Sequence, residues 1–114
     1  MFRVRNLTAH PVTFVSPDGT RSTIAPDPAG PARVVIERVQ EGEVQIEGVP
    51  FPVPVFRSRV AEPAQLPEPE PGVLLLVARA VAEAAPGRED LVIVDQTVRD
   101  DQGRIVGAQA LARL

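Results

Sequence analysis

The sequence predicts a mainly β (α+β) domain: a small antiparallel-rich sheet or partly open barrel, with one short helix near residues 78–85. Short segments of alternating or β-branched apolar residues recur along the chain and are separated by Pro, Gly, Asp and Ser, which is typical of strands joined by turns. One late segment, dominated by alanine, has the composition of a helix. The length of 114 residues allows one hydrophobic core without disulfide or metal support, so we expect residues 1–114 to form a single domain.

Three strands are expected in the first quarter of the chain. Phe2 and Val4 alternate with arginines, which is the period-two pattern of a half-buried strand. The β-branched run that follows is joined to its return strand by Ser16-Pro17-Asp18-Gly19, a sequence with the chemistry of a tight turn. A loop with three prolines, 25–31, ends this unit because proline cannot donate a ladder hydrogen bond. The expected strands cover residues 2–7, 12–15 and 21–24.

The middle of the chain is expected to hold a second hairpin and an extended segment. Residues 32–40 and 43–47 have strand patterns, and the Glu41-Gly42 pair between them predicts the turn. Residues 49–60 carry prolines at alternate positions, which suits an edge strand or a polyproline segment. The proline-rich segment 61–72 is predicted to be a crossing loop.

The last third of the chain combines a buried strand, the helix and a terminal hairpin. The continuous apolar run 73–77 predicts a strand buried on both faces. The alanine-rich helix 78–85 is expected to end at Pro86-Gly87. A strand at 91–94, with 96–98 as its continuation, turns at 100–103 into a final strand, 104–111.

Composition excludes several classes of partner. The formal net charge is −3 and the only aromatics are four scattered phenylalanines, so nucleic acid is a poor partner: duplexes need a basic surface and single strands need stacking platforms. The absence of cysteine excludes disulfides and thiolate metal sites. No signal-peptide pattern is visible, and the longest apolar run is too short to span a bilayer. We therefore expect a cytoplasmic protein with no membrane contact.

The residues that could carry chemistry are few. His10 is the only histidine, so neither a zinc signature nor a serine–histidine pair has its partners. The sequence contains no Gly-x-Ser-x-Gly, Walker A or Gly-x-Gly-x-x-Gly pattern. No catalytic residue, metal ligand or cofactor is therefore predicted. Polar residues gather instead at strand ends, and the candidate ligand-binding residues are Asn6, Thr8, His10, Arg33, Arg88, Asp90, Arg99 and Asp100.

Two interpretations of these candidate residues stay open. Asn6, Thr8 and His10 either satisfy backbone groups in a bend between two strands or belong to a ligand site. The arginines and aspartates at the two ends of the strand 91–94 either line a polar pocket or form surface ion pairs.

Three hypotheses for function follow. The leading one is a non-enzymatic binding or interaction module whose partner is an unknown protein or a small anionic ligand. The second is a small enzyme that acts on a nucleotide or another phosphorylated compound, with arginines on the anion and Asp90 or Asp100 as base. The third is a structural or assembly protein that forms homo-oligomers through a proline-rich edge strand around Phe51 to Phe56.

Three short motifs carry a resemblance to known sequences. They are an N-terminal Asn-Leu-Thr-x-His at 6–10, a Leu-Pro-x-Pro segment at 66–69, and a C-terminal Val-Arg-Asp-x-x-Gly-Arg-Ile-x-Gly at 98–107. In these motifs the chain resembles a family of small bacterial and bacteriophage proteins, and the resemblance covers nearly the whole chain. It implies a self-contained, phage-related accessory protein, and it implies no activity, cofactor or substrate. Serines of the family pattern are replaced here by Ala29 and Ala78.

Overall fold

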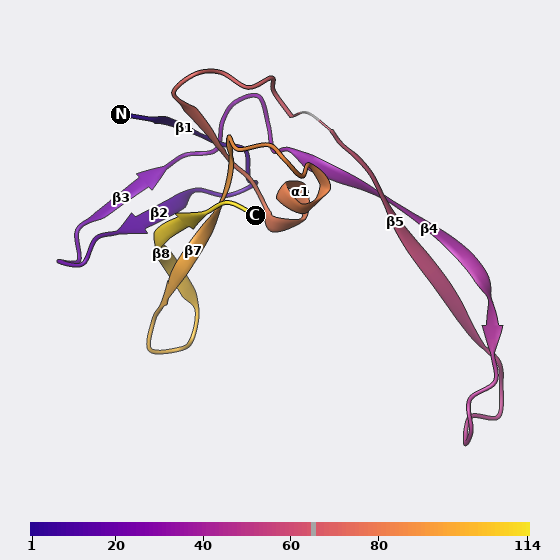
Figure 1. Ribbon diagram of the computed structural model, residues 1–114. Coiled ribbons are helices and arrows are strands. Elements are labelled where there is room, and N and C mark those ends of the chain that lie inside the picture. Colours follow the sequence, from indigo (N-terminus) through magenta and orange to yellow (C-terminus); the bar gives the residue numbers. More distant parts are fainter. Residues whose placement is uncertain (65) are drawn as a thin grey trace.

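A computed structural model describes residues 1–64 and 66–114 of the chain (Figure 1). It has two parts: a body built on a six-stranded sheet and a short helix, and a long two-stranded hairpin that projects from this body. The predicted mainly β fold with one short helix is confirmed. In chain order the elements are β1 (Arg3–Asn6), β2 (Val12–Val15), β3 (Arg21–Ile24), β4 (Arg33–Val44), β5 (Val53–Ala64), β6 (Val73–Leu76), α1 (Arg79–Ala84), β7 (Leu91–Arg99) and β8 (Ile105–Ala112).

The body sheet has the strand order β1-β6-β7-β8-β2-β3. The pairs β1·β6, β6·β7 and β2·β8 are parallel, and the hairpins β2·β3 and β7·β8 are antiparallel, as expected for both hairpins. The two ends of the sheet meet, because Asn6 of β1 bridges Pro26 just after β3. The backbone N–H of Asp27 donates to the Asn6 carbonyl at 2.8 Å. The body is therefore a nearly closed barrel.

The hydrophobic core lies around β6 and β7. Adjacent residues of a strand point to opposite faces, and both Leu75 and Leu76 of β6 are buried. On β7, Leu91, Val92 and Ile93 are likewise buried in succession. The prediction that the run 73–77 is a strand buried on both faces is confirmed.

Helix α1 covers one face of this pair of strands. It buries Val81 and Ala82 against the cluster that contains Leu75 and Leu91. The helix ends just before Pro86-Gly87, as predicted, because proline cannot continue an α-helix. Throughout the described part of the chain, no helix is long and apolar enough to cross a membrane.

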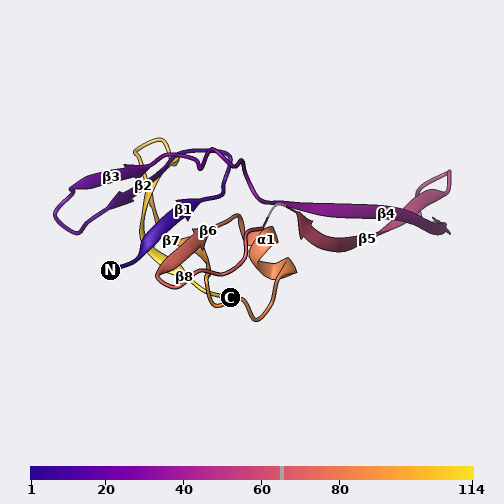
Figure 2. The same cartoon turned by 90° about the horizontal axis from the view of Figure 1, so that it is seen from above.

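The antiparallel pair β4·β5, residues 33–64, projects from the body, and we name it the arm. Both of its strands have 12 residues, and both views show it extending well beyond the barrel (Figures 1 and 2). Val34, near its base, packs against the core next to α1. The radius of gyration is 18.6 Å, whereas roughly 13 Å is typical of a compact chain of this length.

The predicted turn at Glu41-Gly42 is wrong. β4 continues through these residues and pairs with β5, so the chain reverses in the loop 45–52. The register shifts between Gln40 and Gly42, and Gly42 has a φ of 141°, which together identify a β-bulge. Glycine adopts this backbone conformation without the steric cost of a Cβ. The residue that suggested a turn therefore allows an irregularity within a longer strand.

The prolines of the segment 49–60 fall where strands tolerate them. Pro50 and Pro52 lie in the reversing loop, and Pro54 lies on β5, which is an edge strand as predicted. The segment 61–72 was predicted to be a loop. This prediction is wrong for its first residues, up to Ala64, because their backbone belongs to β5 and pairs with β4. Gln65 of that segment lies outside the described residues.

Candidate functional site

Asn6 is the buried polar residue at the seam of the barrel, where it is 1% exposed. Its Nδ2 donates to the carbonyl oxygens of His10 at 2.9 Å and Ile24 at 3.1 Å. Its Oδ1 accepts from the backbone N–H of Thr8 at 3.0 Å and from the Thr8 hydroxyl at 2.6 Å. Both donors and both acceptor positions of the amide are thus used by the protein itself. This geometry favours the interpretation that Asn6 satisfies backbone groups in a bend.

Thr8 and His10 complete the same bend and also reach the surface. Thr8 Oγ1 lies 2.9 Å from the His10 carbonyl oxygen, so the hydroxyl belongs to the network around Asn6. The His10 residue is exposed, and its hydrogen bonds in this network are made by its backbone carbonyl. The network fixes the backbone and leaves the imidazole free of it.

An ion pair that sequence reasoning missed closes the same seam. Arg5 Nε donates to Asp27 Oδ2 at 2.9 Å, and Arg5 Nη2 donates to Asp27 Oδ1 at 3.3 Å. The backbone N–H of Ala29 donates to the same carboxylate at 2.9 Å. The Arg5 guanidinium, and after it the Ala29 N–H, lower the pKa of Asp27 to about 2. The only sequence signal for this role is an aspartate held between Pro26 and Pro28.

This ion pair predicts an acid-sensitive seam. The pKa of Asp27 in the folded protein is about 2, whereas an unperturbed Asp titrates at ~3.9. Its contribution to stability is therefore complete above about pH 4 and is lost as the pH falls toward about 2. We expect Asp27→Asn to remove part of the fall in Tm over this window, measured by circular dichroism between pH 6 and pH 2.

The control for this experiment is the shape of the difference between the two curves. The pKa values of Asp18, Asp90 and Asp100 are also lowered, so both proteins should lose stability in acid. Only the difference in Tm between the unmodified protein and Asp27→Asn at each pH reports on Asp27. A difference in Tm that stays constant from pH 6 to pH 2 would contradict the assigned role of the Arg5–Asp27 pair.

A concave surface lies where the arm leaves the body, and we name it the base hollow. It consists of two adjoining cavities, of about 300 and about 320 Å³, which share Ala32, Arg33 and Ala78. Its lining is mainly apolar, with Arg33 as its cationic residue. The other lining residues are Leu7, Thr8, Ala9, His10 and Pro31 on one side, and Val34, Ile36, Ala80 and Val81 on the other. Of the candidate residues, the structure thus brings Thr8, His10 and Arg33 together, and Asn6 holds Thr8 in place.

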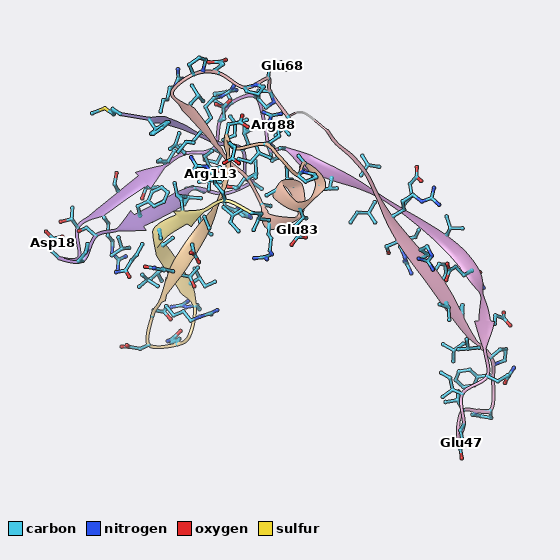
Figure 3. All side chains as sticks on the ribbon, in the orientation of Figure 1. Asp18, Glu47, Glu68, Glu83, Arg88 and Arg113 are labelled. Atoms are coloured by element: carbon cyan, nitrogen blue, oxygen red, sulfur yellow. The ribbon has the colours of Figure 1, made fainter. Side chains whose placement is uncertain are left out.

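Arg88 and Asp90 form an ion pair at the start of β7, in a different place. Arg88 donates from Nε and Nη2 to the two oxygens of Asp90, at 2.9 and 2.7 Å. Arg88 Nη2 also donates to the Pro67 carbonyl at 2.8 Å. The guanidinium lowers the pKa of Asp90. This partly buried pair, labelled at Arg88 in Figure 3, ties the segment before β6 to β7, and it favours the ion-pair interpretation over an anion site.

Arg99 is the last residue of β7, and Asp100 begins the turn that joins β7 to β8, which projects away from α1 and the arm (Figure 1). Asp100 Oδ1 accepts from the backbone N–H groups of Gln102 and Arg104, each at 2.9 Å. The Arg104 N–H lowers the pKa of the Asp100 carboxyl. Arg99 Nη1 donates to the Gly103 carbonyl at 2.7 Å. The structure does not bring these two residues together with Arg88 and Asp90, because β7 separates the two pairs.

The described side chains offer no ready centre for a metal ion. Over residues 1–59 and 66–114, the part of the chain whose side chains are described, no group of three His, Asp or Glu side chains converges. The buried side-chain nitrogen and oxygen atoms that are described all have hydrogen-bond partners. None of them is left pointing at a ligand.

The arm presents large apolar side chains to solvent. Val39 is 56% exposed and Phe51 is 60% exposed, and Arg38 lies over the Phe56 ring at 4.4 Å from its centroid. Sequence reasoning singled out 51–56 as a contact segment but missed the facing strand, whose signal was an apolar pattern that continues past Gly42. The exposed large hydrophobic residues of the arm are Val35, Ile36, Val39, Val44, Ile46, Phe51, Val55 and Phe56.

Comparisons with protein-family models, with curated proteins and with solved structures found no match for this chain. The base hollow and the arm are therefore the candidate functional surfaces of the described chain.

Proposed function

We propose that this chain is a cytoplasmic, non-enzymatic interaction module that binds a protein partner through the arm. One observation carries the proposal: two 12-residue strands project from the body and expose a run of large hydrophobic side chains. Contiguous exposed apolar surface on a folded protein typically marks an interaction site.

The stability of the arm supports the same proposal. A two-stranded hairpin on its own is marginally stable in water, because neither face is covered and both edges lack a neighbour. In this protein, α1 packs near the base, and no third strand joins the two-stranded sheet within residues 1–64 and 66–114. A bound partner would cover the apolar side chains and supply the missing packing.

The candidate residues favour a binding module over the enzymatic alternative. Asp90, a candidate base, is held by two hydrogen bonds from Arg88. Asp100, the other candidate, accepts two backbone N–H groups within its own turn. Carboxylates with lowered pKa values and occupied acceptors are poor general bases at neutral pH.

The proposal is tested with a photo-crosslinking amino acid placed on the arm in the full-length protein. Position 36 on the arm and position 105 on the body form a matched pair, since Ile36 is 56% and Ile105 is 57% exposed and both lie on strands. After illumination in cells, we expect protein adducts from position 36 at least several-fold above those from position 105. Equal adduct yields at the two positions would contradict the proposal. The adduct mass also distinguishes a second copy of the chain from a different protein.

A further inference from the structure

We infer that the partner of the arm is a second copy of this chain, in a two-fold symmetric dimer in which the arm tip of each copy occupies the base hollow of the other. This inference rests on the proposed function, because it names the occupant of the same surface. Three features of the arm support it: the distribution of its charges, the match between its two ends, and its length.

The charges of the arm are segregated by sign along its length. Residues 41–55, which form the tip, contain three glutamates and no basic residue. The remainder of the arm contains four arginines and two glutamates. Figure 3 shows Glu47 at the end farthest from the body, while Arg33 is the first residue of β4 and lines the base hollow. The arm therefore has an acidic tip and a basic base.

This charge pattern is self-complementary under a two-fold axis. In a two-fold contact the same surface is used by both copies, so residue i of one meets residue j of the other, and j meets i. Two arms packed antiparallel would place the acidic tip of each against the basic base of the other. A parallel arrangement would instead set tip against tip and repel. A polyanionic partner would be repelled by the tip, and a polycationic partner by the base.

The polarity of the two ends also matches. The tip exposes Phe51 and Ile46 beyond the last paired residues of β4 and β5. The base hollow has an apolar lining that includes Ile36 and Ala80, with Arg33 at the boundary between its two cavities. Apolar side chains of the tip would meet the apolar lining of the hollow, while Glu47 would lie near Arg33. This pairing removes exposed apolar surface at both ends of each arm.

The arm is long enough for both contacts to form at once. A strand of 12 residues spans roughly 40 Å, so tip and base are separated by most of the length of the arm. Ile36 and Arg38 share one face of β4, and the register Gln40↔Phe56 places the Phe56 side chain on that face as well. The two arms would pack along this face, between the two tip-to-base contacts.

Charge reversal in the full-length protein tests the inference. Glu47→Arg and Arg33→Glu each replace two attractive tip-to-base contacts per dimer with two repulsive ones, so we expect each to raise the dimer Kd at least tenfold. The double variant restores the opposite signs and should return the Kd to within about threefold of the unmodified protein. Sedimentation velocity over a concentration series measures these values. Asp101→Arg, an exposed change in the β7–β8 turn, is the matched control and should leave the Kd unchanged.

The possible outcomes separate this inference from the proposed function. A dimer that both single reversals weaken and the double variant restores supports the inference. A monomer at all concentrations, with position 36 crosslinked to a different protein, overturns the inference and leaves the proposed function standing. A dimer that is insensitive to the reversals, or not restored by the double variant, overturns the tip-to-base arrangement. Far-UV circular dichroism and the Tm of each variant, compared with those of Asp101→Arg, exclude loss of folding as the cause.

Discussion

Leu76→Ala should lower the free energy of unfolding by about 3–4 kcal/mol, which is within the range measured for removing a fully buried leucine side chain. Leu76 is 0% exposed and lies on β6, a strand whose side chains are buried on both faces of the sheet. The loss combines the transfer free energy of the removed carbons with the cost of the cavity they leave. Urea denaturation at neutral pH measures the change.

Ile105→Ala is the matched control for this substitution. Ile105 is also an aliphatic strand residue, but it lies at the exposed start of β8. Surface changes of this kind usually stay within about 0.5 kcal/mol. A loss below about 1 kcal/mol for Leu76→Ala would contradict the placement of the core around β6 and β7.

Asn6→Ala should be destabilising to a similar degree, by about 3–4 kcal/mol, although the side chain is polar. The substitution removes all four hydrogen bonds of the buried amide, each worth about 1 kcal/mol net, and leaves carbonyls and an N–H group without this partner. Because these groups join the end of β1 to the bend and to β3, we expect the seam of the barrel to open first. Hydrogen exchange at the backbone N–H of Asp27, bound to the Asn6 carbonyl, should rise locally.

Thr13→Val serves as the comparison for Asn6→Ala. It removes the exposed hydrogen bond between the hydroxyls of Thr13 and Thr23, 2.8 Å apart on β2 and β3. Solvent can replace that contact, so the expected change is below about 0.5 kcal/mol. If the two substitutions lowered the free energy of unfolding equally, the Asn6 hydrogen bonds would not be what holds the barrel closed.

The elements that the sequence predicted correctly are those determined by local patterns. The hairpin of β2 and β3 follows from β-branched residues on both sides of a Ser-Pro-Asp-Gly turn. The buried strand β6 follows from a continuous apolar run, and the end of α1 follows from Pro86-Gly87. Each of these signals depends on residues close together in the sequence, so the structure it predicts does not depend on long-range contacts.

The arm was predicted incorrectly because its register depends on residues far apart in the sequence. Glu41-Gly42 has the local composition of a turn, yet pairing with β5 along 12 residues offers more backbone hydrogen bonds than an early reversal. Gly42 then serves as a bulge. No pattern within a short window distinguishes these two uses of a glycine.

The candidate site shows the same division between local and long-range information. Asn6, Thr8 and His10 lie within five residues, and the sequence correctly groups them. The addition of Arg33 and the exclusion of Arg99 from this group depend on how the arm leaves the barrel. The Arg5–Asp27 pair was missed because its members are joined only by closure of the sheet.

Hydrogen exchange on the arm tests most directly whether a second copy covers it. The unmodified protein and Glu47→Arg are compared at the same concentration. Exchange is followed at the backbone N–H groups of residues 36–40, which lie on β4, several residues before the loop that contains position 47. We predict that these groups are protected in the unmodified protein and lose most of that protection in the variant, while β6 and β7 stay protected in both. Equal protection of residues 36–40 in the two proteins, or no protection in either, would contradict a dimer held together by its arms.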